Sequence, residues 1–403
     1  MGEPDRPPGR AWSGRATRAE IDLDALGGNV RALRSLLPPG ASLMAVVKAN
    51  AYGHGATVVA REALVAGAER LAVATIGEAA VLRRAGIDAP ILILGAIDPA
   101  EAPMAVRLRI ELAIATEALL DAVADAARGT SPAGPVRLHV KVETGLHRYG
   151  AEPDLALALA RRIARDPRLE LAGAFTHFAC ADEADDGFTR EQDAAFSAWL
   201  GRLRGESIAF AAHHRANSAA TIGGWAGESG IARCGIAMYG IAPSPAAPLP
   251  SGVRPVMSLR SRVARVFDLR PGDTVGYGRT YRCEAAERAA LVPVGYADGY
   301  ARALSGTGHM ALGGCRAPLL GRISMDQCVV RVPDGVDAES GAEVVVLGAD
   351  PAGIAPSIEG VAEAAGTIGY EIASRIAARV PRVYVRGGEI VAVEDALSDL
   401  GGF

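Results

Sequence analysis

Lysine is nearly absent from this chain: only Lys48 and Lys141 occur among its 42 basic residues, and the rest are arginines. Arginine stays protonated in proteins and offers no free amine, whereas lysine can lose its proton and form an imine or a carbamate. A lysine retained in so arginine-rich a chain is therefore a candidate for covalent chemistry. The alternative, that either lysine remains by chance, has to be judged on its sequence context.

Three further shortages limit the class of protein. The five cysteines form no Cys-x-x-Cys pair, which disfavours a disulfide framework and a structural zinc site, so we expect a reducing, cytoplasmic location and no metal. The net charge is −4 and the arginines are not clustered, so no nucleic-acid partner is expected. No apolar run approaches the ~20 residues of a membrane span, and residues 1–15 carry no apolar signal segment, so no membrane association is expected.

Strand-like apolar runs alternate with helix-like amphipathic segments through the first part of the chain. We expect strands to end at eight positions: Val47, Thr75, Gly95, Thr116, Glu143, His177, Asn217 and Tyr239. Eight strand and helix units within ~250 residues are what a TIM-type (β/α)8 barrel requires. The pattern therefore predicts an α/β fold, with a doubly wound sheet as the alternative.

A proline-rich segment at residues 242–250 marks a change of pattern and a domain boundary. Beyond it the apolar runs are short and the turns are rich in Gly, Pro and Asp, which predicts a mostly β domain. We therefore expect a flexible N-terminal tail over residues 1–17, a barrel over 18–245 and a C-terminal β domain over 246–403.

Lys48 ends the apolar run that starts at Leu43 and precedes a glycine-punctuated loop at residues 49–56. Active sites of barrels are built at the carboxyl ends of the strands, and an apolar wall there lowers the pKa of an amine. A lysine whose ammonium simply reaches solvent from a strand end is common in general. It is less expected where lysine is rare.

Polar residues also occur in and after the expected fifth strand. His139, Lys141 and Glu143 alternate with apolar residues and therefore share one face of that strand. Arg148 follows in the next turn, at the expected mouth of the barrel, where a guanidinium can hold a carboxylate. An internal ion pair between Lys141 and Glu143 explains the polar face equally well.

The ends of the last three expected strands add polar groups to the same mouth: Thr176 and His177, Asn217 and Ser218, and Arg233 to Ile236. The Ser218 hydroxyl and backbone amides near Gly235 would suit a phosphate, although each turn taken alone is ordinary loop chemistry. In the second domain Tyr277, Tyr296 and Tyr370 lie next to glycines that permit close approach to a ligand. Most such tyrosines pack in a β core instead.

Two segments together, residues 45–55 (AVVKANAYGHG) and 321–327 (GRISMDQ), resemble the signatures of the alanine racemase family. The resemblance extends from Ala19 to about Val385. It implies a pyridoxal 5'-phosphate enzyme with an α/β barrel followed by a β domain, in which two bases on opposite faces exchange the α-proton of alanine. It also implies a homodimer with active sites at the subunit interface, and a role in supplying D-alanine for peptidoglycan.

The resemblance assigns a role to each matching residue. It implies that Lys48 holds the cofactor and is one catalytic base, and that Tyr277 of the partner subunit is the other. The substrate would be bound by Arg148 with Met325 and Tyr296 of the partner subunit. The cofactor-binding residues that it implies are Lys48, Tyr52, His177, Asn217, Ser218, Arg233, Gly235, Ile236 and Tyr370. It matches Lys141 to a lysine that often carries a carbamate, an anion able to orient Arg148.

The substrate pocket is expected to be small because tyrosines crowd it, which favours alanine but leaves serine open. A decarboxylase or aldolase of the same fold would share Lys48 without needing Tyr277 opposite it. A non-catalytic carrier of the cofactor would need neither Tyr277 nor Met325, so the complete β domain disfavours it.

Overall fold

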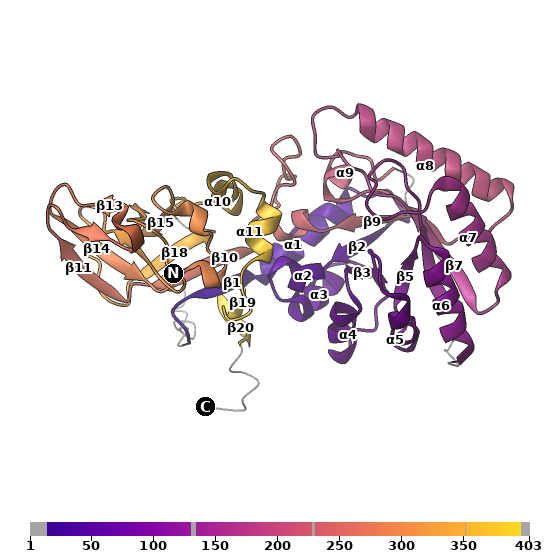
Figure 1. Ribbon diagram of the computed structural model, residues 1–403, viewed down its shortest axis with the longest axis horizontal. Helices are drawn as coiled ribbons and strands as arrows, with labels where there is room; N and C mark the ends of the chain where they lie inside the picture. Colours follow the sequence, from indigo (N-terminus) through magenta and orange to yellow (C-terminus); the bar gives the residue numbers. More distant parts are fainter. Residues whose placement is uncertain (1–13, 130–133, 228–229, 351, 396–403) are drawn as a thin grey trace, which may run out of the picture.

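The computed structural model describes residues 14–129, 134–227, 230–350 and 352–395 and places two domains side by side (Figure 1). The barrel is on the right of the figure and the mostly β domain on the left. No helix of the described residues is long and apolar enough to cross a membrane.

The barrel has eight parallel strands in the order β8-β7-β6-β5-β4-β3-β2-β9. They are β2 (Ser42–Val46), β3 (Arg70–Val73), β4 (Ile91–Ile93), β5 (Glu111–Ile114), β6 (Val136–Lys141), β7 (Leu169–Phe175), β8 (Ala212–His214) and β9 (Ile231–Cys234). Two amides, of Gly230 and Arg233, donate to the carbonyls of His213 and Ala216 over 3.0 Å and close the seam between β8 and β9. The predicted barrel is therefore confirmed.

The strands are mostly apolar because both of their faces are buried, but polar side chains such as His139, His214 and Arg233 interrupt β6, β8 and β9. Seven strands end one to three residues before the expected positions, and the eighth ends at Cys234 rather than Tyr239. Gly235 leaves the strand conformation with φ −117° and ψ −97°, and the 3-10 helix η2 (Ile236–Tyr239) follows. This turn carries two backbone amides of the site described below.

The barrel helices cover the outside of the strands (Figure 1). They are α3 (Ala56–Val65), α4 (Ile76–Arg84), α5 (Ala102–Arg107), α6 (Glu117–Gly129), α7 (Pro153–Arg165), α8 (Gly187–Gly205) and α9 (Ser218–Ile222). A further helix, α1 (Leu23–Ser35), starts where the Asp22 carboxylate accepts a hydrogen bond from the Ala25 amide over 2.8 Å.

A seven-stranded sheet in the order β16-β15-β18-β10-β1-β19-β20 forms the base of the second domain. Its strands are β1 (Arg18–Asp22), β10 (Met257–Arg262), β15 (His309–Leu312), β16 (Cys315–Pro318), β18 (Glu343–Gly348), β19 (Arg382–Arg386) and β20 (Glu389–Glu394). Residues 18–22 were expected to begin the barrel domain. They form β1 instead, which pairs with β10 and β19 of the second domain.

A flexible tail was expected over residues 1–17, and residues 1–13 of it lie outside the described residues. Its last residue, Thr17, is buried, and its hydroxyl donates to the Pro293 carbonyl over 2.6 Å.

The rest of the second domain is built from short elements. A three-stranded sheet contains β11 (Arg265–Leu269), β14 (Glu287–Val292) and β17 (Cys328–Arg331), and a ribbon pairs β12 (Thr274–Val275) with β13 (Tyr281–Arg282). Two helices, α10 (Ile358–Ala365) and α11 (Gly369–Ser374), lie between this domain and the barrel (Figure 1). The helix α11 thereby brings Tyr370 and Ser374 to the barrel mouth.

Candidate active site

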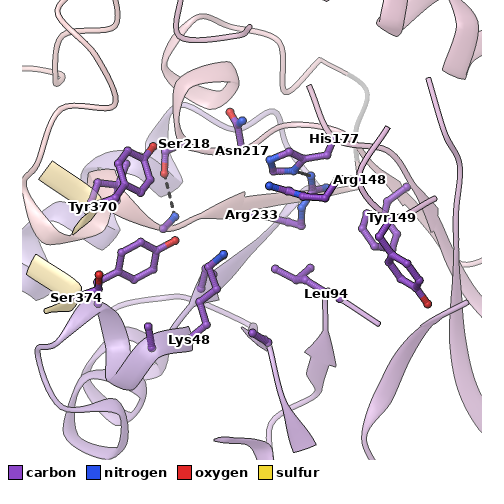
Figure 2. A pocket seen from close by; sticks show the side chains of 18 of the residues that line it. Lys48, Leu94, Arg148, Tyr149, His177, Asn217, Ser218, Arg233, Tyr370 and Ser374 are labelled. Atoms are coloured by element: carbon purple, nitrogen blue, oxygen red, sulfur yellow. Dashed lines mark hydrogen bonds between the residues drawn. The ribbon is translucent and has the colours of Figure 1, made fainter. Parts of the chain in front are cut away.

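A cavity of about 660 Å³ opens at the carboxyl ends of the barrel strands (Figure 2). Its walls come from the ends of the strands, from the segments that follow them and from α11. Eleven of the predicted site residues line it: Lys48, Tyr52, Lys141, Arg148, His177, Asn217, Ser218, Arg233, Gly235, Ile236 and Tyr370. Two lysines and two arginines are among them, and no aspartate or glutamate belongs to the described lining, so the cavity favours anionic ligands.

Lys48 enters the cavity from an unusual turn. The helix α2 (Lys48–Tyr52) follows β2, and its residues 49–52 all have positive φ between 52° and 54° although none is glycine. Such a conformation costs roughly 1–2 kcal/mol per residue, so the surroundings have to enforce it. The Glu78 carboxylate accepts from the Ala49 and Ala74 amides over 2.7 and 2.8 Å, and the Asn50 side chain accepts from the Ala56 amide over 2.7 Å. These bonds hold the turn from which the Lys48 side chain points into the cavity (Figure 2).

The surroundings of Lys48 favour its neutral amine. Burial lowers the pKa of Lys48, the positive charge of Arg148 lowers it further, and Glu78 opposes both effects. A neutral amine is a nucleophile and a base.

Lys141, the last residue of β6, lies in a second buried position. Its Nζ donates to the Leu94 carbonyl over 3.3 Å and lies 5.3 Å from the centre of the Phe175 ring. Burial, followed by the charges of Arg233 and Arg148, lowers the pKa of Lys141 to about 7. The alternative of an ion pair with Glu143 is not found among the described ion pairs, although the charge of Glu143 raises the pKa of Lys141. The Glu143 carboxylate accepts from the Gly145 amide over 2.6 Å.

Arg233 is buried near the end of β9. Its Nη1 donates to His214 Nδ1 over 2.9 Å, and its Nη2 donates to the Thr176 carbonyl over 3.0 Å and to His177 Nδ1 over 3.2 Å. Burial lowers the pKa of Arg233 to about 9, which leaves it cationic at neutral pH. Burial and the Arg233 charge hold the pKa of His177 well below its usual value, so this imidazole is neutral. The hydrogen bonds of Arg233 to described residues use Nη1 and Nη2, and none of them uses Nε.

Opposite Arg233 and His177, the wall next to Tyr370 forms a cradle (Figure 2). The Ser218 hydroxyl accepts from the Gly235 amide over 2.9 Å, the dashed bond in Figure 2, and from the Ala237 amide over 3.4 Å. A Cβ at residue 235 would lie 2.6 Å from the Tyr52 hydroxyl, so only glycine leaves this space open. Burial raises the pKa of Tyr370 to about 12, which keeps its hydroxyl available as a donor. The cradle thus offers hydroxyls to an anion, beside backbone amides that converge on Ser218.

Two further predicted cofactor residues, Asn217 and Ile236, support the cradle. The Asn217 side chain accepts from the Ala220 amide over 2.9 Å and caps α9, the helix that begins with Ser218. Ile236 lies between the two amides that reach Ser218.

Three predicted residues do not line this cavity: Tyr277, Tyr296 and Met325. They belong to the second domain and are 72%, 41% and 52% exposed, respectively. Tyr296 and Met325 lie on two loops joined by backbone hydrogen bonds, from the Tyr296 amide to Ser324 over 3.1 Å and from the Ala297 amide to Met325 over 2.9 Å.

Nine residues of the lining were not predicted as site residues: Val46, Ala49, Ala74, Leu94, Gly95, Ala96, Tyr149, Phe175 and Ser374. Leu94 acts through its carbonyl and Phe175 through its ring face, which no motif reveals. Tyr149 follows Arg148 directly, and its hydroxyl donates to the Ala113 carbonyl over 3.0 Å. Its position beside a predicted residue was the one available signal.

Residues 21–243 match the family model of the alanine racemase N-terminal domain, and residues 256–384 match that of the C-terminal domain. The chain belongs to the alanine racemase family. It is 42% identical to the alanine racemase of Desulfovibrio desulfuricans over 371 residues, which are 92% of this chain and 98% of the relative. It is also 42% identical to the alanine racemase of Geobacillus stearothermophilus over 392 residues, 95% of this chain and 97% of the relative.

Solved structures of alanine racemases share the fold. The enzyme from Bacillus anthracis with bound L-Ala-P superposes with a TM-score of 0.90 at 37% identity, over 96% of this chain and all of the other. The enzyme from Streptomyces coelicolor superposes with a TM-score of 0.87 at 40% identity, over 92% of this chain and 98% of the other.

The cofactor of the alanine racemase family is pyridoxal 5'-phosphate, and the residues present fit this group. The cation-rich cavity suits its phosphate, and the Ser218 and Tyr370 hydroxyls line the same cavity. None of the hydrogen bonds that Arg233 makes to described residues uses its Nε.

Proposed function

We propose that this protein interconverts L-alanine and D-alanine by a two-base mechanism with Lys48 and with Tyr277 of the partner subunit as the bases. The observation that carries the proposal is the buried Lys48 amine, whose pKa is lowered, in a cavity that also contains Arg148, Arg233 and the Ser218 cradle. An amine, a carboxylate site and a phosphate site converge there, as a cofactor-linked amino acid requires.

Pyridoxal 5'-phosphate, when bound, supplies a ring that delocalises the electron pair left on the substrate Cα after a proton is removed. The Ser218 hydroxyl, the amides of Gly235 and Ile236, and the hydroxyls of Tyr52 and Tyr370 would hold its phosphate. Arg233 would face the ring nitrogen through Nε, held in place by His177. Because this arginine remains cationic, it would keep the ring nitrogen unprotonated and limit side reactions.

Lys48 would hold the cofactor covalently until the substrate amine displaces it, and its free Nζ would then accept or return the Cα proton on one face. The neighbouring Arg148 both lowers the pKa of Lys48 and offers its guanidinium to the substrate carboxylate. A carbamate on Lys141 would orient Arg148. The neutral fraction of Lys141 at pH 7 supports this, because only a neutral amine adds to carbon dioxide.

A base for the opposite face is provided by a second copy of the chain in this proposal. Tyr277, Tyr296 and Met325 carry large side chains that are exposed on the second domain, outside the cavity of their own chain. A symmetric dimer would bring these residues of each subunit to the cavity of the other, with the Met325 amide of the partner subunit at the substrate carboxylate. The exposed apolar side chains would then be buried.

Two inactive variants test the reaction and the shared site together. Lys48→Ala and Tyr277→Phe should each abolish most formation of D-alanine from L-alanine, measured by chiral chromatography. After random exchange of subunits, half of the dimers carry one intact site, so about a quarter of the wild-type activity should return. Tyr281→Phe, in the same ribbon, should behave as the wild type. Absence of recovery with properly mixed subunits would contradict the shared site, and absence of D-alanine with the wild type would contradict the reaction. Serine in a parallel assay tests the substrate.

The protein would act in the cytoplasm and supply D-alanine for peptidoglycan. The five free cysteines suit a reducing compartment, and the compared relatives come from bacteria. A D-alanine requirement on deletion of the gene would test this role.

A further inference from the structure

Below the cavity, four buried polar side chains form an unbroken chain of hydrogen bonds through the barrel. Glu111 Oε2 lies 3.0 Å from His139 Nε2, His139 Nδ1 lies 2.9 Å from His214 Nε2, and His214 Nδ1 lies 2.9 Å from Arg233 Nη1. Glu111 is the first residue of β5, and Arg233 is near the end of β9. The chain therefore connects the amino end of the barrel to the end that carries the cavity. We call it the Glu111 relay.

The strands are shaped to admit the Glu111 relay. The pairing of β6 with β7 shifts register between Leu138 and His139, so His139 is opposite Gly173. A Cβ at Gly173 would lie 2.3 Å from His139 Nδ1, and only a glycine leaves room for this ring. The Phe175 ring stacks on His214 at 4.6 Å with an interplanar angle of 9°. A register shift re-aims side chains, so this local irregularity places the two imidazoles in contact.

The hydrogen-bonding capacities at the two ends determine the direction of every bond in between. An ionised carboxylate only accepts, and a guanidinium only donates. His139 must therefore donate from Nε2 to Glu111 and accept at Nδ1. His214 must likewise donate from Nε2 and accept at Nδ1 from Arg233. Both imidazoles are then neutral, because an added proton on either would place two N–H groups against each other.

The charges around the relay support this state. The Glu111 carboxylate also accepts from Arg70 Nη1 over 3.1 Å and from Arg137 Nε over 2.7 Å. Burial alone would raise the pKa of Glu111, but the His139 hydrogen bond and these arginines bring it to about 2. Burial is also the main reason that the pKa values of His139 and His214 are lowered.

Glu111 opposes the neutral state of His139, because its hydrogen bond and its charge raise the pKa of that imidazole, but burial is the larger effect. The cationic neighbours act in the same sense as burial. The guanidiniums of Arg70 and Arg137 oppose a proton on His139. Arg233, Arg70 and the adjacent His213 oppose one on His214.

We propose that the Glu111 relay fixes the orientation and charge of Arg233: ionised Glu111 sets one tautomer on His139 and His214, and His214 then holds the guanidinium with Nε free. The inference rests on the proposed function, in which Nε faces the cofactor ring. Glu111, His139 and His214 are positioning residues in this scheme, because none of them lines the cavity. Without the Glu111 charge the opposite tautomers become available, and a His214 N–H would then point at the Arg233 donors.

Histidine tautomers give a test that does not depend on activity. Protein with 15N-labelled histidine, loaded with cofactor, is studied by long-range 1H–15N spectra between pH 5.5 and 8.5, with assignments from His139→Gln and His214→Gln. We expect both residues to carry the proton on Nε2 throughout and to show no titration. A proton on Nδ1, or a titration of either residue in this range, would overturn the relay.

A pair of matched variants tests the effect on the reaction. Glu111→Gln removes the charge from the relay, whereas Glu170→Gln removes another carboxylate that pairs with Arg137 at the same end of the barrel. Loss of one oriented charge-assisted bond predicts a fall in kcat of about 10-fold or more for Glu111→Gln. The KM for alanine should stay within about twofold, because Arg148 is untouched. The visible absorption band of the bound cofactor should also shift.

The outcomes separate the two proposals. Equal kcat and equal spectra for Glu111→Gln and Glu170→Gln would refute the relay even if the protein racemises alanine. If no D-alanine forms at all, the tautomers and the spectral shift still decide the relay, while the proposed function fails. If circular dichroism shows that Glu111→Gln does not fold, His139→Gln serves as the second variant. The 1H–15N histidine spectra of the wild type test the relay in either case.

Discussion

Replacement of Gly235 by alanine perturbs the proposed phosphate cradle at a single atom. The added Cβ would lie 2.6 Å from the Tyr52 hydroxyl oxygen, 3.2 Å from Cζ of the same ring and 3.5 Å from the Val46 Cβ. Relief of this contact requires the Tyr52 hydroxyl to move by roughly 0.8 Å. The ring has little freedom to do so, because it packs against Tyr239 at 5.0 Å and Tyr370 at 6.2 Å.

The magnitude follows from the bond that would be lost. Tyr52 is assigned to the phosphate, and a hydrogen bond to a charged group contributes about 1.5–3 kcal/mol. Cofactor affinity should therefore fall by about 10- to 150-fold.

The assay is a titration of cofactor-free protein with pyridoxal 5'-phosphate, followed by the visible absorption of the bound form. Gly95→Ala is the matched control, because Gly95 lines the same cavity and its added Cβ would only meet the Ala74 carbonyl at 3.9 Å. Titration with pyridoxal, which lacks the phosphate, should give the same affinity for both variants. Wild-type affinity of Gly235→Ala for pyridoxal 5'-phosphate, or an equal loss with pyridoxal, would refute the assignment of the cradle.

Three further predictions concern other parts of the site. Tyr277→Phe should lower racemisation by about 10²- to 10⁴-fold. One enantiomer of alanine should still exchange its α-hydrogen with deuterated solvent, which proton NMR measures. Exchange of both enantiomers would contradict a mechanism with two bases. Burial, followed by the charges of Arg233 and Arg148, lowers the pKa of Lys141 from 10.5 to about 7. Between these two pH values Lys141 is protonated in the unfolded chain but largely neutral in the folded protein, so the free energy of unfolding rises with pH. Lys141→Met should remove that rise and stabilise the protein below pH 7 in denaturant titrations without carbon dioxide; an unchanged slope would contradict the shift. Asp298→Asn should raise the KM for alanine at least several-fold. The buried Asp298 carboxylate accepts from the Gly295 amide over 3.0 Å and so holds the loop that carries Tyr296. An unchanged KM would show that this loop does not depend on the carboxylate.

The barrel and the cavity could be predicted from the sequence because the signals are local. Strands buried on both faces are apolar runs, and the polar residues that follow them must meet at one end of a parallel barrel. Lys48 and Arg233 were recognisable on this basis alone. The resemblance to the family added the residues expected from the partner subunit, such as Tyr277. Within one chain Tyr277 lies on the second domain, away from the cavity, so its position alone does not indicate a site.

Three features could not be predicted, each for a physical reason. The pairing of β1 with the second domain depends on strands more than two hundred residues away. The left-handed turn at residues 49–52 is formed by residue types that do not favour positive φ and is imposed by partners such as Glu78. The contact of His139 with His214 depends on a register shift between two strands. A sequence pattern carries none of this information.

The position of β1 has a consequence for how the protein can be divided. Ile21 of β1 pairs with Met257 of β10, and everything between them in the chain forms the barrel and its linker. The barrel is thus an insertion between two neighbouring strands of one sheet. A fragment that starts at the proline-rich linker would lack the strand between β10 and β19 and would expose two unpaired edges. The domains cannot be separated by one cut, and any hinge motion between them must bend two connections at once.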